Sequence, residues 1–206
     1  MTTLALPRSR GALLVDLAIA ASAAAAAAAV CLLVLHLVRP GLDPGWSVVS
    51  QYALGAHGWI LTTMFLLLAA ACVSLAAALS SGALRRAGRT GRVLLVVAAL
   101  GLTVSAAFVV GAPLHDVGSL VGNAGLAIGA VLVGRDLRRG LDAPARRRSA
   151  IAAHAPWICA VLMGVFIATA TWGVGLLNRA VVLAYIVWLL LAARQSAAVR
   201  RAASAR

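Results

Sequence analysis

Apolar residues in this chain occur in six long runs, separated by shorter polar segments. Each run has roughly twenty residues with almost no charge, which is the length that an α-helix needs to cross the hydrocarbon layer of a membrane. We predict membrane spans at residues 12–38, 58–79, 93–112, 117–133, 151–172 and 179–193. The expected fold class is therefore all-α: a polytopic membrane protein built as a bundle of six transmembrane helices.

The positions of the arginines predict the orientation of this bundle. The chain has 18 basic residues, all arginine, against five acidic residues, a formal net charge of +13. All but Arg39 and Arg179 lie before the first run, after the last run, or in the second and fourth gaps. Positive residues in short loops are retained on the cytoplasmic side during insertion. We therefore expect both termini in the cytoplasm and a multi-pass protein of the plasma membrane.

Composition supports a single membrane domain. With 63% hydrophobic and 11% charged residues, the chain has too little polar surface for a soluble domain. We divide it into a cytoplasmic N-terminal tail (1–11), a six-span domain (12–194) and a cytoplasmic basic tail (195–206). Topology accounts for the positive charge, so we assign no nucleic-acid partner; the expected partner is the bilayer, including anionic lipid attracted to the arginines. Arginine without lysine or glutamate, and abundant alanine, are typical of a GC-rich bacterial genome.

Polar residues suited to chemistry gather on the predicted outer side. The longest outer gap, residues 39–57, begins with two prolines and two glycines, which exclude a regular helix there. Together with the other outer gaps it contributes a polar cluster that we interpret as a ligand-binding or structural site: Asp43, Ser47, Ser50, Tyr52, His115, Asp116 and Arg179.

The pair His115-Asp116 is the sharpest local signal in the cluster. A histidine beside a carboxylate suits general base and orienter roles in a hydrolase or transferase. With His36 and His57 it could also ligate zinc, but no HxxxH or HExxH spacing places two ligands on one helical face. Alternatively, Asp116 caps the helix that begins after Pro113. We assign no metal and no cofactor, and these alternatives stay open.

Arg179 stands at the start of the sixth run, on the side that otherwise has few arginines. Its side chain can extend to the outer headgroups, pair with Asp116 or Asp43 across the bundle, or hold an anionic ligand such as a lipid phosphate. In the fourth run, Gly118, Gly122, Gly125 and Gly129 form two small-xxx-small pairs, which predict close helix packing.

Three strings of residues resemble one known family. They are the outer segment Asp43-Pro44-Gly45-Trp46-Ser47-Val48-Val49-Ser50-Gln51-Tyr52, the element Pro113-Leu114-His115-Asp116, and the pair Asn178-Arg179. They resemble the bacterial and archaeal membrane proteins of domain-of-unknown-function family 998, over roughly residues 12–194. The resemblance implies a six-helix fold and no catalytic residues.

The sequence thus predicts an integral membrane protein with a polar site on its outer face, and it leaves the activity open. The site binds a lipid headgroup or small molecule, or it is structural. The alternative is a membrane-embedded hydrolase or transferase that uses His115 and Asp116.

Overall fold

The computed structural model describes residues 10–80, 84–139 and 141–204. Within these ranges the chain forms six α-helices and one short 3-10 helix. They are α1 (Arg10–Val38), the 3-10 helix η1 (Val49–Ala53), α2 (Gly58–Ala78), α3 (Arg86–Ala107), α4 (Pro113–Leu137), α5 (Ala143–Ala168) and α6 (Val174–Ser204). All six α-helices are long and apolar enough to cross a membrane. The all-α, six-span fold predicted from the sequence is confirmed, and the chain is a multi-pass membrane protein.

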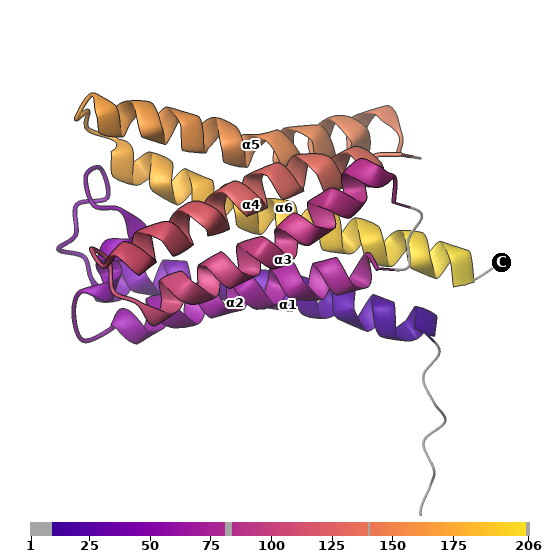
Figure 1. Ribbon diagram of the computed structural model, residues 1–206, viewed down its shortest axis with the longest axis horizontal. Helices are drawn as coiled ribbons and strands as arrows, with labels where there is room; N and C mark the ends of the chain where they lie inside the picture. The colour runs from indigo at the N-terminus through magenta and orange to yellow at the C-terminus, as the bar shows by residue number, and fades with distance from the viewer. Residues whose placement is uncertain (1–9, 81–83, 140, 205–206) are drawn as a thin grey trace, which may run out of the picture.

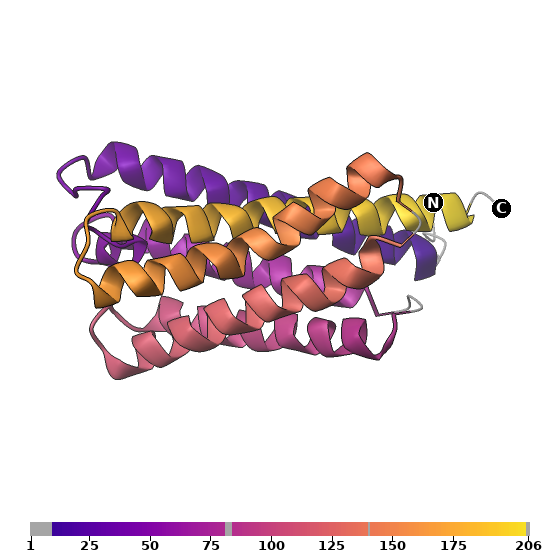
Figure 2. The ribbon, with the colours of Figure 1, turned by 90° about the horizontal axis from the view of Figure 1, so that it is seen from above.

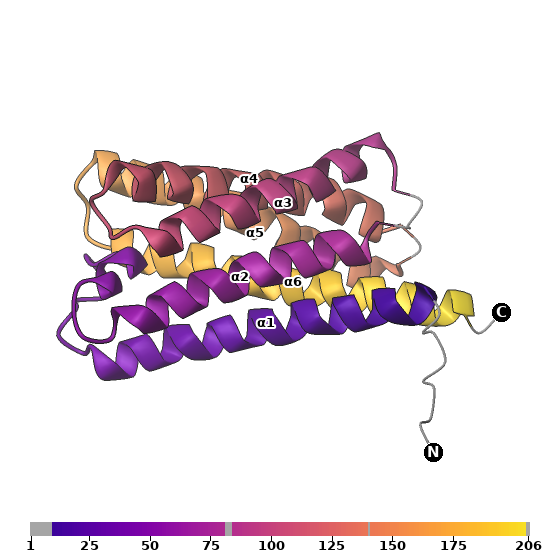
Figure 3. The same cartoon turned by 60° about the horizontal axis from the view of Figure 1, so that its bottom comes forward.

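The helices run alternately up and down in one elongated bundle (Figure 1). Connections 39–57, 108–112 and 169–173 lie at one end, which we call the loop end. The start of α1, the end of α6, the end of α2 with the start of α3, and the end of α4 with the start of α5 lie at the opposite end (Figures 2 and 3). We call this the arginine end, because the arginine-rich gaps of the sequence fall there. The predicted N-terminal tail falls mostly outside the described residues.

Several helices extend beyond the predicted spans at the arginine end. Helix α3 begins at Arg86 rather than residue 93, α5 at Ala143 rather than residue 151, and α6 continues to Ser204. The predicted spans began or ended at the arginine-rich gaps, whereas arginine is a good helix former and its long side chain can extend into water. The apolar run therefore measures the membrane-crossing part of a helix and not its full length.

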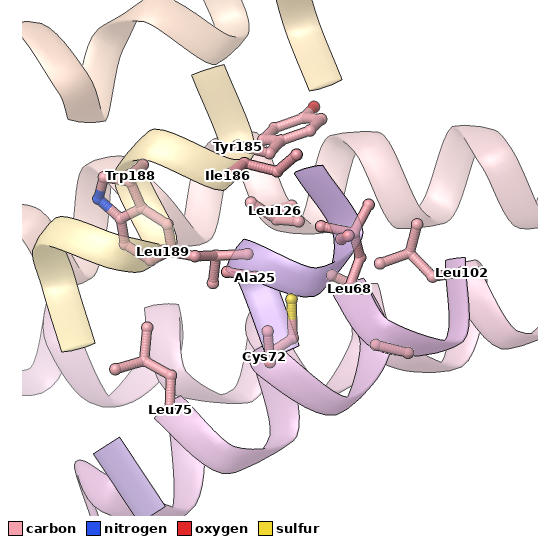
Figure 4. Close-up of a cluster of buried hydrophobic side chains, with 14 of the residues drawn as sticks. Ala25, Leu68, Cys72, Leu75, Leu102, Leu126, Tyr185, Ile186, Trp188 and Leu189 are labelled. Atoms are coloured by element: carbon pink, nitrogen blue, oxygen red, sulfur yellow. The ribbon is translucent and has the colours of Figure 1, made fainter. Parts of the chain in front are cut away.

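The interior is packed with leucine and alanine side chains, to which α5 contributes Ala152 and Ala153. Figure 4 shows this core, with Leu68, Cys72 and Leu75 of α2 facing Trp188 and Leu189 of α6. Outward-facing positions are also apolar; Leu120, for example, is 70% exposed. A protein surrounded by lipid needs no polar outer face, so burial here depends on side-chain size and shape more than on polarity.

The predicted close packing of the α4 glycines is confirmed along α3. A Cβ atom added to Gly118 would lie 2.8 Å from the carbonyl oxygen of Gly101, and one added to Gly101 would lie 2.4 Å from the amide nitrogen of Gly122. Glycine is required at these positions because the two backbones touch. The contact fixes the α3–α4 pair, which lies on one side of the bundle (Figure 2).

Candidate functional site

Arg179 organises the loop end from the first turns of α6. Its side chain is only 7% exposed. The Nη1 group donates to the carbonyl oxygens of Ser47 at 2.6 Å, Gly175 at 2.9 Å and Pro44 at 3.2 Å. A buried guanidinium is tolerated only when its N–H groups are hydrogen-bonded. Here backbone carbonyls of the 39–57 connection meet that requirement, and the connection is thereby fixed to α6.

Two aromatic side chains complete the surroundings of Arg179. Its Nε donates to His36 Nε2 at 2.7 Å, and its Nη2 donates to the Tyr52 hydroxyl at 3.1 Å. His36 Nδ1 lies 2.7 Å from the Leu32 carbonyl oxygen, to which it donates. Because Nε2 accepts and Nδ1 donates, this geometry requires the neutral imidazole. Tyr52 is 1% exposed, and the guanidinium carbon lies 5.6 Å from its ring centroid, within cation–π range.

None of the partners of Arg179 among the described residues is a carboxylate. Asp43, one of the two predicted ion-pair partners, instead uses Oδ1 to accept from the Gly45 amide at 2.7 Å, which closes a tight turn. Asp116, the other, is exposed and forms no side-chain hydrogen bond with the described residues. Arg179 donates to neutral carbonyls because the chain between Pro44 and Ser47 passes directly over the start of α6.

The Asp-Pro-Gly turn also caps α6. The Gly45 carbonyl oxygen accepts from the amides of Gly173 at 3.1 Å and Gly175 at 2.8 Å. These amides stand at the start of the helix, where no intrahelical acceptor exists. A Cβ atom at Gly45 would lie 2.2 Å from Trp172 Nε1, so a larger residue here would displace the indole ring. Asn178 adds another link, since its Oδ1 accepts from the Val49 amide at 2.8 Å.

His115 lies in a different part of the loop end, between α3 and α4. It is 2% exposed, and its Nδ1 donates to the carbonyl oxygens of Ser105 at 3.0 Å and Phe108 at 2.9 Å. These carbonyls belong to the last turn of α3, where intrahelical donors are missing. The Nε2 atom is buried and has no hydrogen-bond partner among the described residues. His115 therefore joins the α3–α4 hairpin and keeps one free acceptor.

Asp116 does not cap α4 through a side-chain hydrogen bond. The N-cap position is Ala112, and Pro113 follows it at the first helical position. Asp116 lies in the first turn, where a carboxylate interacts favourably with the helix dipole. Backbone carbonyls orient His115, so the expected pairing of His115 with Asp116 is not formed.

A cavity of about 190 Å³ lies below the 39–57 connection, between η1 and helices α2 to α6. Leu68, Leu102 and Leu126 line its deep part with the ring of Tyr185, and these side chains are labelled in Figure 4. Its polar lining consists of hydroxyl and amide side chains from four elements: Ser50, Ser105, Ser119, Asn123, Asn178 and Tyr185. None of the described residues that line it is charged.

The polar lining is held by hydrogen bonds that leave part of it free. Tyr185 donates to the Asn123 carbonyl oxygen at 2.9 Å, and Asn123 Nδ2 donates to the Ser119 carbonyl oxygen at 2.7 Å. The hydroxyls of Ser105 and Ser119 lie 3.0 Å apart. The Asn123 Oδ1 atom forms no hydrogen bond with the described residues. The cavity thus presents uncharged donors and acceptors in an apolar surround, as small-molecule sites commonly do.

The seven residues predicted as one outer cluster fall into separate places. Asp43, Ser47, Tyr52 and Arg179 meet where the 39–57 connection crosses α6, while Ser50 lines the cavity. His115 and Asp116 lie on the α3–α4 hairpin. Within the described ranges no three His, Cys or Asp side chains lie close enough to hold a metal ion, so the donors of the zinc hypothesis are not assembled.

Most of the polar side chains that line the cavity were not singled out from the sequence. Ser105, Ser119, Asn123 and Tyr185 stand alone inside apolar runs, without a motif. One signal was available: a polar side chain at membrane depth must find a partner within the bundle. Asn123 and Ser119 are four residues apart and hence share one helical face.

The chain belongs to the family described as protein of unknown function DUF998, which it matches over residues 22–195. This match confirms the resemblance inferred from the three strings of residues. It extends from α1 to α6 and so includes both the Arg179 contacts and the cavity. Comparison with curated proteins found no match. Comparison with solved structures found none either.

Proposed function

We propose that the protein binds a small uncharged molecule, or the uncharged part of a lipid headgroup, in the cavity at the loop end. The observation that carries this proposal is the lining itself: hydroxyl and amide groups from several helices surround about 190 Å³ of space without a charged side chain. An apolar cavity of about 150 Å³ in another protein binds benzene. The cavity thus suits a group of about ring size that carries hydroxyl or carbonyl oxygens.

The contacts of Arg179 support an uncharged ligand over an anionic one. Its guanidinium is buried and donates to three backbone carbonyls, one imidazole and one phenol. Little hydrogen-bonding capacity remains for a phosphate or carboxylate. In this proposal Arg179 holds the 39–57 connection in place over the cavity, and hydroxyl and amide groups recognise the ligand.

A filling substitution tests the proposal. Ser119→Leu places an apolar side chain in the cavity, whereas Ala124→Leu makes a matched change at an exposed position of the same helix. Each protein is extracted into nanodiscs from the same cells, and the bound molecules are identified by native mass spectrometry. We expect a molecule bound near one per chain in the parent and in Ala124→Leu, and at least a tenfold loss in Ser119→Leu. Equal retention in Ser119→Leu, or no bound molecule in the parent, contradicts the proposal.

The orientation belongs to the same proposal. We infer that the arginine end lies in the cytoplasm and the loop end on the outer face of the plasma membrane, as the positive-inside rule indicates. Asp142→Cys places a thiol at an exposed position of the arginine end. We expect no reaction of intact cells with a membrane-impermeant maleimide at this cysteine and full reaction after permeabilisation. Labelling of intact cells overturns the orientation.

A membrane hydrolase or transferase is the second candidate, and one observation favours it. Two carbonyls hold Nδ1 of His115, and its Nε2 is buried without a hydrogen-bond partner among the described residues, in a position where it could exchange a proton with a bound molecule. If His115 were catalytic, His115→Asn would stop turnover while the ligand stayed bound and accumulated in the membranes. Under the binding proposal, the lipid and metabolite profiles of parent and His115→Asn cells are the same.

A further inference from the structure

A second pocket lies at the opposite end of the molecule and is lined almost entirely by arginine. It has a volume of about 520 Å³ and is bordered by Arg135, Arg138, Arg139, Arg146 and Ala150. The first three come from the end of α4 and the others from the first turns of α5. Neither the binding cavity nor the Arg179 contacts use any of these residues.

Protein groups neutralise only part of this charge. Arg139 pairs with Asp136, with 3.0 Å between Nη2 and Oδ1. Arg146 donates to the Leu141 carbonyl oxygen at 3.0 Å, which gives a hydrogen bond but no opposite charge. The side chains of Arg135 and Arg138 have no hydrogen bond or ion pair with any described residue. Partial burial, together with the positive charge of Arg135, lowers the pKa of Arg138.

A second carboxylate of this region, Asp142, does not line the pocket. Asp142 is the N-cap of α5, and its Oδ1 accepts from the Ala145 amide at 2.8 Å. Asp136 is also committed, since its Oδ2 accepts from the Arg85 amide at 2.9 Å. Asp136 thus pairs with Arg139, while no described acid forms an ion pair with Arg135 or Arg138, whose guanidinium groups repel each other. An anion is the chemical class that fits the pocket.

The pocket lies where the apolar part of the bundle meets water. The membrane-crossing helix α4 ends at Leu137, directly beside it. Val131 and the exposed Ile128 precede Arg135 by four and seven residues and so continue its face toward the bilayer centre. On α5 the exposed Trp157 follows Ala150 by seven residues and does the same. A polar cationic opening thus continues into apolar helix faces.

We propose that this pocket binds the phosphate of an anionic membrane lipid, whose acyl chains lie along the apolar faces of α4 and α5. Guanidinium groups bind phosphate oxygens in pairs of parallel hydrogen bonds, which an ammonium group cannot form. The free side chains of Arg135 and Arg138 supply these contacts. A free phosphate ion would use the arginines alone, whereas a lipid also uses the apolar faces.

The test compares two pairs of arginines that differ only in location. Arg135→Gln/Arg138→Gln removes two charges from the pocket, and Arg147→Gln/Arg148→Gln removes two from exposed positions of the same region that do not line it. Each protein is placed in nanodiscs of phosphatidylcholine with increasing phosphatidylglycerol, and bound lipids are counted by native mass spectrometry. General attraction to the anionic surface depends on charge and predicts equal losses. We expect at least a fivefold loss of bound phosphatidylglycerol for the pocket pair and less than twofold for the control.

Two further measurements keep the test decisive. Arg138→Lys retains the charge but not the paired geometry, so we expect a loss between those of the two double variants; it also replaces the pocket pair if that protein does not fold. Millimolar inorganic phosphate, added to nanodiscs of phosphatidylcholine alone, should not raise the melting temperature of the parent. Equal losses in both pairs overturn the site, and stabilisation by phosphate that requires Arg135 and Arg138 overturns its assignment to a lipid. Neither result depends on the cavity at the loop end.

Discussion

The two ends of the bundle use the same side chain in opposite ways. At the loop end, Arg179 is buried, and all its partners among the described residues are neutral. At the arginine end, most arginines are exposed, and Arg135 and Arg138 lack a partner among the described residues. A buried guanidinium must be hydrogen-bonded in one fixed geometry, whereas a solvated one has no such requirement. Arg179 therefore fixes the local structure of the loop end, whereas the other arginines set the charge of the arginine end.

This difference separates two kinds of function. A connection held by one buried residue can cover a cavity and keep its lining in place. A set of guanidinium groups free of protein partners can instead bind anions from outside the protein. The uncharged cavity and the cationic pocket lie at opposite ends of one bundle, so each can be altered without the other.

The largest expected effect is at Arg179. Arg179→Ala leaves the Ser47 carbonyl, the His36 Nε2 and the Tyr52 hydroxyl without their donor, at about 1–3 kcal/mol for each buried group that stays unsatisfied. We expect the free energy of unfolding to fall by about 3 kcal/mol in detergent, and residues 39–57 to become sensitive to protease. Arg179→Lys should be nearly as destabilising, because lysine lacks the planar fork. Arg148→Ala, at an exposed position, should change the free energy of unfolding by less than about 0.5 kcal/mol. If all three variants are equally stable, the buried and the exposed arginines do not differ in their contribution to stability.

Gly101→Ala tests whether α3 and α4 form a rigid backbone contact between the two ends of the bundle. The new methyl group would meet the Gly122 amide nitrogen at 2.4 Å, and backbone atoms cannot move aside as a side chain can. We expect a loss of about 2 kcal/mol in the free energy of unfolding. Gly164→Ala is the matched control, because nothing lies within 4 Å of its Cβ position. Its higher helix propensity should leave stability unchanged or raised by up to about 1 kcal/mol. If the two variants behave alike, the α3–α4 contact is looser than described.

His36 sharpens the description of the loop end. His36→Leu removes the acceptor of the Arg179 Nε–H and leaves that donor buried. We expect a loss of about 1.5 kcal/mol in the free energy of unfolding, measured by thermal and denaturant unfolding. His57→Leu makes the same change at an exposed histidine of the 39–57 connection and should be nearly neutral. A neutral His36→Leu would show that α1 does not contribute to fixing Arg179.

The smallest expected effect is at Asp116. It is exposed and forms no side-chain hydrogen bond within the described chain, so Asp116→Asn removes only a favourable interaction with the α4 dipole. We expect a loss of about 0.5 kcal/mol in stability and no loss of the molecule bound in the cavity. A large loss of bound molecule would restore Asp116 to the site.

The membrane-crossing segments could be predicted from the sequence, but the meeting of particular side chains could not. The transfer of a residue into hydrocarbon depends mainly on that residue, so apolar runs and arginine-rich gaps can be added up along the chain. The contact between Arg179 and His36 joins residues 143 positions apart and depends on how α1 and α6 pack. The family-like strings included both Asp43 and Arg179. Neither string indicated that Arg179 would donate to backbone carbonyls.

By itself the sequence determined the six helices, the grouping of arginines at one end and the small residues along α4, because these follow from local transfer free energies and from helical spacing. Only the tertiary structure separated His115 from Arg179, exposed Asp116 and formed a cavity from isolated polar residues such as Asn123. The physical reason is that lipid leaves the inward and outward faces of each helix equally apolar. Close backbone contacts and the path of one connection therefore decide which faces meet.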